Sequence, residues 1–126
     1  MIQTPDVIVE NCRTFNVWQE GVRMSFLGDF GEGPPPYNVL VRNCTVEKCR
    51  AGVVGHYRYS ADGRKTWANA AAAPIRGVEV EGCAFRNLSG AALDFNHSAD
   101  CRFRGNTFDN ASATPRLSVC EDMDFD

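Results

Sequence analysis

The fold prediction starts from the segment Val39-Leu-Val-Arg-Asn-Cys-Thr-Val-Glu-Lys-Cys49, because the chain contains it in four related forms. Aligned on Cys44, the other three are Val7-Ile-Val-Glu-Asn-Cys12, Val78-Glu-Val-Glu-Gly-Cys83 and Cys101-Arg-Phe-Arg-Gly-Asn106. The aligned positions are 32, 39 and 23 residues apart, and leaving out two segments of loop composition, 28–36 and 58–73, makes every spacing 23. A fixed period of this length indicates an internal structural repeat.

Each unit shows the alternation of short strands. The inward positions of the first strand are Val7, Val39, Val78 and Cys101, then Val9, Val41, Val80 and Phe103. A corner of Asn or Gly follows, the residue types that most readily adopt a left-handed backbone (Asn11, Asn43, Gly82 and Gly105). A second strand, a second polar turn and, after a glycine, a third strand complete the unit. The pattern predicts an all-β parallel β-helix solenoid of about four coils with three short strands per coil.

The outward positions support this prediction. Two residues before the aligned position, charges of opposite sign alternate from unit to unit (Glu10, Arg42, Glu81 and Arg104). Opposite charges on neighbouring strands attract each other, whereas like charges repel. The alternation therefore favours units whose first strands lie side by side.

The run Gly90-Ala-Ala-Leu-Asp-Phe95, with Cys101-Arg-Phe-Arg-Gly-Asn-Thr-Phe-Asp-Asn110, resembles the repeat of right-handed parallel β-helix proteins of the pectate-lyase-like superfamily. The resemblance covers roughly residues 6–119. It implies a right-handed coil and a carbohydrate function, since that superfamily includes polysaccharide lyases, glycoside hydrolases, uronate epimerases, carbohydrate esterases and phage tailspikes. A repeat identifies a fold better than an activity. Two functions stay open: an enzyme acting on an acidic polysaccharide, and a non-catalytic structural, oligomerisation or glycan-binding module.

Length and composition limit the other classes. The 126 residues predict one domain over 1–126, complete or part of a longer β-helix protein. The net charge is −3 without a basic run, so nucleic acid is not an expected partner. No stretch approaches the roughly 20 apolar residues of a membrane span. The first residues lack the pattern of a signal peptide, and the sequence assigns no compartment.

Six cysteines raise the question of disulfides. Cys12, Cys44 and Cys83 occupy one column, where stacked Cβ atoms lie about 4.8 Å apart, wider than the ~3.8 Å of a disulfide. We therefore expect buried thiols, with Cys120, beyond the repeats, as the most reactive one. No Cys-x-x-Cys spacing is present, and neither a metal nor another cofactor is predicted.

The two inserts leave the units at the same place, after the third strand. We therefore expect them to project from one edge and to form a wall for a polysaccharide. They carry the aromatic side chains Phe30, Tyr59 and Trp67 for stacking on sugars and the cations Arg58, Arg64 and Lys65 for carboxylates. Plain loop variation is the alternative interpretation.

Candidate catalytic residues are found by counting four positions on from each glycine (Gly21, Gly52 and Gly90), which gives Ser25, His56 and Asp94. Alternation places the three side chains outward, in one column. His56, oriented by Asp94, is the candidate general base, and Ser25 is a weaker candidate nucleophile. On a uronate, His56 would take the C5 proton while Arg23 or an insert arginine neutralises the carboxylate. The alternative is that His56 is a half-exposed residue that makes a hydrogen bond.

The first coil predicts self-association. Val7 begins a strand almost at the amino terminus, which leaves the apolar cross-section of this coil unstacked. An open strand edge invites pairing with another chain. We expect a homodimer joined through the first coil, because the same patch then serves both copies.

Overall fold

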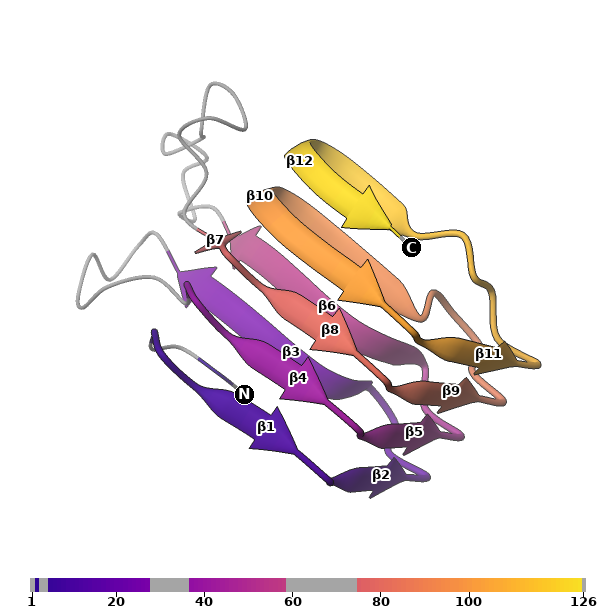
Figure 1. Cartoon of the computed structure of the whole chain (residues 1–126). Helices are drawn as coiled ribbons and strands as arrows, with labels where there is room; N and C mark the ends of the chain where they lie inside the picture. Colours follow the sequence, from indigo (N-terminus) through magenta and orange to yellow (C-terminus); the bar gives the residue numbers. More distant parts are fainter. Residues whose placement is uncertain (1, 3–4, 28–36, 59–74, 126) are drawn as a thin grey trace.

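The structure, a computed structural model, describes residues 2, 5–27, 37–58 and 75–125. In these residues all strands pair in parallel and form two sheets (Figure 1). The larger sheet contains β1 (Ile8–Glu10), β3 (Glu20–Leu27), β4 (Leu40–Arg42), β6 (Ala51–Arg58), β7 (Ile75–Arg76), β8 (Glu79–Glu81), β10 (Leu93–Arg104) and β12 (Arg116–Phe125). The smaller sheet contains β2 (Arg13–Phe15), β5 (Thr45–Glu47), β9 (Ala84–Arg86) and β11 (Thr107–Asp109).

This architecture corrects the predicted solenoid. Strand β10 runs unbroken over 12 residues and pairs first with β6, then with β7 and β8, while β12 follows it on the other side. The larger sheet therefore curls, as Figure 1 shows, where two separate short strands were expected. No insert interrupts the chain here, so hydrogen bonding continues past His97. The all-β prediction is confirmed, and the four-coil β-helix with three short strands per coil is wrong.

The alignment of the units is nevertheless confirmed as strand register. Val9 pairs with Val41, Val41 with Val80, and Val80 with Phe103, across β1, β4, β8 and β10. The corner residues also have the predicted left-handed backbone. The φ angles are 56° at Asn11, 52° at Asn43, 63° at Gly82 and 63° at Gly105.

The core lies between the inward faces of the two sheets. It consists mainly of β-branched and aromatic side chains, which fit a pleated surface. Val41, Val46, Val53, Val80, Phe85 and Phe95 are at most 1% exposed. Phe85 stacks on Phe108 with ring centroids 5.5 Å apart, and Phe95 meets Phe103 edge-on at 5.2 Å. These ring contacts pack the repeats of the C-terminal half against each other.

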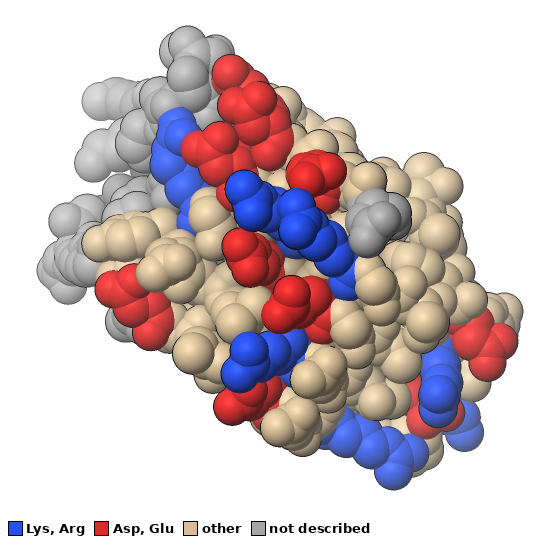
Figure 2. All heavy atoms as spheres, in the orientation of Figure 1, with Lys and Arg blue, Asp and Glu red and all other residues tan. Residues whose placement is uncertain are grey.

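Ion pairs link neighbouring strands on the outside. The pair of Arg42 with Glu10 belongs to the predicted alternating column, whereas Arg104 pairs with Asp124 instead of Glu81. Arg42 contacts Glu10 at 2.6 Å, and Arg104 contacts Asp124 at 3.4 Å. Figure 2 shows Lys and Arg interleaved with Asp and Glu on the visible face, with no large region of one sign. Exposed pairs of this kind contribute little each, about 0–1 kcal/mol, so they help to set register more than stability.

The first repeat is less well covered than the second. Val41 and Val53 are fully buried, whereas their partners Val9 and Val22 are partly exposed. Trp18, at the corner before β3, is 83% exposed. Strand β1 therefore lies at an edge of its sheet, with β4 as its neighbour among the described strands.

All six cysteines are free thiols. Burial raises the pKa of Cys83 to about 11 and that of Cys101 to about 12, and it also raises the pKa of Cys44. Cys12 is exposed, whereas Cys120, expected to be the most accessible, is only partly so. The ordering of thiol accessibility at the two ends is thus the reverse of the prediction, because β12 packs against β10 and shields Cys120.

The two inserts leave the larger sheet at adjacent places. Leu27 ends β3 and Arg58 ends β6, and the two residues pair in register. Arg58 is therefore the last residue of a strand rather than the first of an insert. Phe30, Tyr59, Arg64, Lys65 and Trp67 lie outside the described residues, and their expected role as a binding wall stays a prediction.

Candidate functional site

The outer face of β3, β6, β10 and β12 carries the candidate site. One row across this face joins Arg23 to Val54, Val54 to Asp94, and Asp94 to Arg116. The next outward row begins with Ser25, whose backbone pairs with that of His56. Since alternate residues of a strand share a face, His56 lies on the same side of the sheet as Val54 and Asp94.

The predicted column of Ser25, His56 and Asp94 is off by two residues at its third member. Asp94 is level with Val54, while Asn96, one step beyond the pair Phe95 and Gly55, is level with His56. The count began from Gly90, but Ala92 is the residue that lies beside Gly52, whose N–H donates to the carbonyl of Ala91. In the third unit, the position from which the candidates should have been counted is therefore occupied by alanine instead of glycine.

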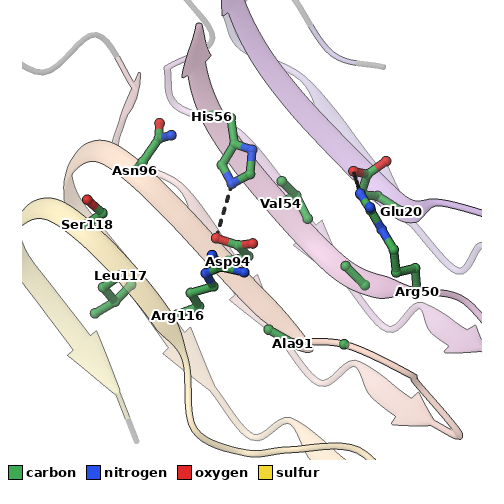
Figure 3. Close-up of a pocket in the computed structure, with 12 residues that line it drawn as sticks. Glu20, Arg50, Val54, His56, Ala91, Asp94, Asn96, Arg116, Leu117 and Ser118 are labelled. Atoms are coloured by element: carbon green, nitrogen blue, oxygen red, sulfur yellow. Dashed lines mark hydrogen bonds and ion pairs between the residues drawn. The ribbon is translucent and has the colours of Figure 1, made fainter. Parts of the chain in front are cut away.

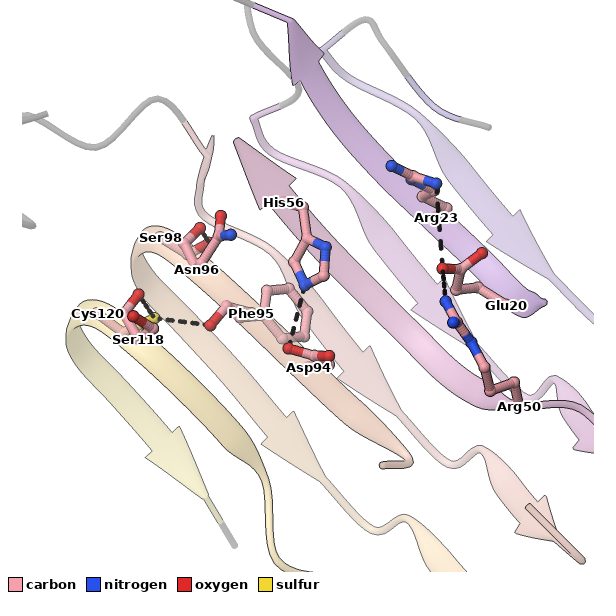
Figure 4. A network of polar contacts seen from close by, with 10 residues as sticks. All are labelled: Glu20, Arg23, Arg50, His56, Asp94, Phe95, Asn96, Ser98, Ser118 and Cys120. Atoms are coloured by element: carbon pink, nitrogen blue, oxygen red, sulfur yellow. Dashed lines mark hydrogen bonds and ion pairs between the residues drawn. The ribbon is translucent and has the colours of Figure 1, made fainter. Parts of the chain in front are cut away.

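His56 and Asp94 still meet, along a diagonal between the two rows (Figure 4). The His56 Nε2 and Asp94 Oδ1 atoms are 3.1 Å apart, and the side chains are 27% and 19% exposed. If the ring proton is on Nε2, the Nε2–H donates a hydrogen bond to the Asp94 carboxylate, and Nδ1 of neutral His56 is left as a proton acceptor. This arrangement is that of a general base held by a carboxylate.

The pair opens into a hollow of about 420 Å³, here called the dyad hollow (Figure 3). Its lining includes Glu20 and Arg50 at one end, His56 and Asp94 in the middle, and Asn96, Arg116, Leu117 and Ser118 at the other. Polar and charged groups therefore converge on a space large enough for a small ligand, which is the usual character of a binding site.

The cationic side chains in and beside the dyad hollow differ in whether they form ion pairs. Arg50 Nη2 contacts Glu20 Oε1 at 3.0 Å, and Arg23 Nη1 lies 4.0 Å from the same oxygen (Figure 4). The Glu20 side chain is only 8% exposed, so these cations balance a largely buried carboxylate. Arg116, by contrast, makes no ion pair within 4.0 Å in the described part of the chain. It is the cation available to a ligand.

The other predicted site residues are placed differently. Arg23 faces Glu20 and lines a separate hollow beside Val9 and Val22, not the dyad hollow. Ser25 is level with His56 in the backbone. Among residues 5–27, 37–58 and 75–125, no group of three His, Cys, Asp or Glu side chains is placed to hold a metal ion.

Sequence reasoning missed Arg116, Arg50 and Glu20. Arg116 could have been found by continuing the repeat beyond Asp94, because it lies 22 residues later, close to one period. Glu20 comes directly before Gly21 and Arg50 comes two residues before Gly52, outside the strand positions from which the candidates were counted. Their pairing depends on the register of β3 and β6, which brings Glu20 beside Ala51.

In the part of the chain that the structure describes, no helix has the length and hydropathy of a membrane span. Compared with protein-family models, curated proteins and solved structures, the chain matches none.

Proposed function

We propose that the chain binds an acidic polysaccharide in the dyad hollow and that His56 acts on it as a general base. The observation that carries the proposal is the His56–Asp94 contact of 3.1 Å opening into the same hollow as Arg116. Arg116 would receive a sugar carboxylate in the two-point geometry that a guanidinium favours. Asp94 would hold the His56 ring in the tautomer that accepts a proton.

Proton abstraction beside a carboxylate is the reaction that fits this set best. His56 Nδ1 would take the C5 proton of a uronate, and Arg116 would stabilise the charge that develops on the carboxylate. In a lyase the C4–O4 bond then breaks, the C5–H electrons form a C4–C5 double bond, and water protonates the leaving oxygen. In an epimerase the C4–O4 bond stays intact, and water on the opposite face gives a proton to C5 while His56 keeps the one that it removed.

Hydrolysis fits less well. Glycosidases generally use two carboxyl groups, one as acid and one as base or nucleophile. The two acids of the dyad hollow are engaged elsewhere: Glu20 with Arg50, and Asp94 with His56. A glycosidase would need two carboxyl groups free to act on the substrate, and neither of these two is without an ion-pair partner.

The experiment is incubation of the full chain with polygalacturonate and alginate, followed by ultraviolet absorbance for unsaturated uronate and by NMR for epimerised residues. We expect a signal that falls about 10²- to 10⁴-fold in His56→Ala, as for loss of a general base. Arg102→Gln, a change at an exposed residue of β10 outside the hollow, should retain most of it. Binding of either polymer without any product would reject the catalytic step and leave a glycan-binding module.

The second candidate function is a non-catalytic module that self-associates through the first repeat. The observation that favours it is the exposure of Ile8 at 62% and Trp18 at 83% on that repeat. Light scattering distinguishes the two: a particle of about twice 13.9 kDa that Val9→Lys converts to a monomer supports the module. A monomer in both proteins rejects it.

A further inference from the structure

A second hollow lies at the corner between the smaller and the larger sheet, and the proposed function does not use it. Its volume is about 390 Å³. It is lined by residues from three successive repeats: Asn16, Val17 and Trp18, then Lys48, Cys49 and Arg50, then Asn87 and Ser89. We call it the corner hollow. Neighbouring strands are about 4.8 Å apart, so a lining drawn from three repeats spans about 10 Å.

Trp18 is the most exposed large apolar side chain of the described residues, at 83%. Indole presents a broad, rigid, apolar face with one N–H donor. Such a face suits the apolar side of a sugar ring, whose hydroxyl groups point outward from the ring edge. Beside it, Asn16 and Asn87 offer amide groups on left-handed corners, with φ angles of 56° and 52°. Asn87 Oδ1 already accepts from Asn110, which leaves its own N–H groups for a ligand.

The charge of the corner hollow is positive. Lys48 Nζ lies 5.3 Å from the centroid of the Phe15 ring and has no carboxylate within ion-pairing distance among the described residues. Arg50 uses one nitrogen for Glu20, and its guanidinium has further donors. Among the residues that the structure describes, no Asp or Glu lines this hollow. A ligand with hydroxyl groups and a carboxylate therefore fits better than a neutral or cationic one.

Arg50 belongs to both hollows, since it lines the corner hollow and the dyad hollow. Figures 3 and 4 show it beside Glu20, and Figure 3 shows it on the side of the dyad hollow away from Arg116. A ligand that extends out of the dyad hollow past Glu20 thus meets Arg50 and then the corner.

We propose that the corner hollow is a second subsite for an acidic oligosaccharide: a sugar ring stacks on Trp18, Lys48 pairs with its carboxylate, and the chain continues across Arg50 to His56. This inference rests on the proposed function for the ligand class. It adds a residue, Trp18, that contacts sugar far from the reacting bond and makes binding depend on ligand length.

The test uses the full chain carrying Trp67→Phe, in which Trp18 is the remaining tryptophan of two. Its fluorescence is followed during titration with oligogalacturonates of graded length and, as a neutral control, with cello-oligosaccharides. We expect quenching that is stronger for long acidic oligomers. For the variants at position 18, which lack this fluorescence, Kd is measured by calorimetric titration. Trp18→Ala should raise Kd for the long acidic oligomers about tenfold, as expected for the loss of an aromatic contact, whereas Trp18→Phe should retain most of the affinity. Lys48→Gln should weaken the binding of acidic oligomers but not that of neutral ones.

Two results would overturn the inference: equal affinity of Trp18→Ala and its parent for long oligomers, or Trp18 emission that changes with protein concentration alone, because a second copy then covers the indole. The subsite and the proposed chemistry can be rejected independently. Quenching of Trp18 without any product supports the subsite and rejects His56 as a base. Product formation that Trp18→Ala leaves unchanged supports the chemistry and rejects the subsite.

Discussion

Nε2 of His56 and Oδ1 of Asp94 lie 3.1 Å apart although the two residues stand in different rows of the sheet. The contact is diagonal, between β6 and β10, and both side chains are more than 70% covered. A partly buried contact to a charged group is stronger than one at an open surface. It therefore links the two strands as well as orienting the ring.

A double-mutant cycle measures this link. His56→Ala, Asp94→Ala and the double variant should give a coupling free energy of about 0.5–1.5 kcal/mol in chemical denaturation. The matched cycle of Asn96 and Val54, which lie on the same two strands and flank the pair, should give a value close to zero. Strictly additive effects of His56→Ala and Asp94→Ala would mean that the two groups do not interact in solution.

The corner of the second repeat depends on a left-handed residue. Asn43 has a φ of 52°, a conformation that β-branched residues resist. Asn43→Val should lower the free energy of unfolding by about 1–3 kcal/mol. Gly105→Val should act alike, since φ is 63° there although a Cβ would meet nothing closer than 3.9 Å. Asn43→Gly is the control and should cost little; melting of both valine variants at the parent temperature would contradict the corner assignment.

At Val119 the native residue is itself β-branched and has a left-handed backbone. This β-branched residue has a φ of 54° and is 42% exposed, so strain is present without much burial to offset it. Val119→Asn should raise the free energy of unfolding by about 1 kcal/mol. Leu117→Asn, at an exposed position two residues earlier on β12, should give no such gain. Calorimetry compares the two, and a lower melting temperature for Val119→Asn would show that the backbone there is not left-handed.

Burial of Cys101 predicts loss of stability in alkali. Its pKa is raised from 9.0 to about 12, chiefly by burial, so above pH 9 the unfolded chain releases the thiol proton before the folded chain does. The contribution is fully present below pH 9 and is lost as pH rises toward 12, at up to about 1.4 kcal/mol per pH unit. Cys101→Ala should reduce this slope between pH 9 and 11, measured by denaturation at each pH. Cys12→Ala, an exposed thiol, is the control, and equal slopes in all three proteins would contradict the burial of Cys101.

The periodic sequence predicted the short strands, the register of the aligned first and second strands of the units and the left-handed corners, because each of these depends on neighbouring residues or on one repeated spacing. Val41 beside Val80 is an example. The repeat pattern did not predict how β10 and β12 join the larger sheet. Their pairing depends on backbone hydrogen bonds that continue past His97, where no insert interrupts the chain. The site was found in part: His56 and Asp94 do meet, but Ala92 takes the place expected for Gly90, which shifts the row and brings Arg116 beside Asp94.

Binding of a sugar carboxylate to Arg116 in the dyad hollow is measured by calorimetric titration of an oligogalacturonate into three proteins. These are the parent chain, Arg116→Gln and Arg102→Gln, the last an exposed arginine of β10 outside the hollow with the same loss of charge. We predict that Arg116→Gln weakens binding about 10- to 100-fold, the loss of a charge-assisted contact, while Arg102→Gln binds within about twofold of the parent, as a distant surface charge should. Equal weakening in both variants, or no binding to the parent chain, would contradict binding at Arg116.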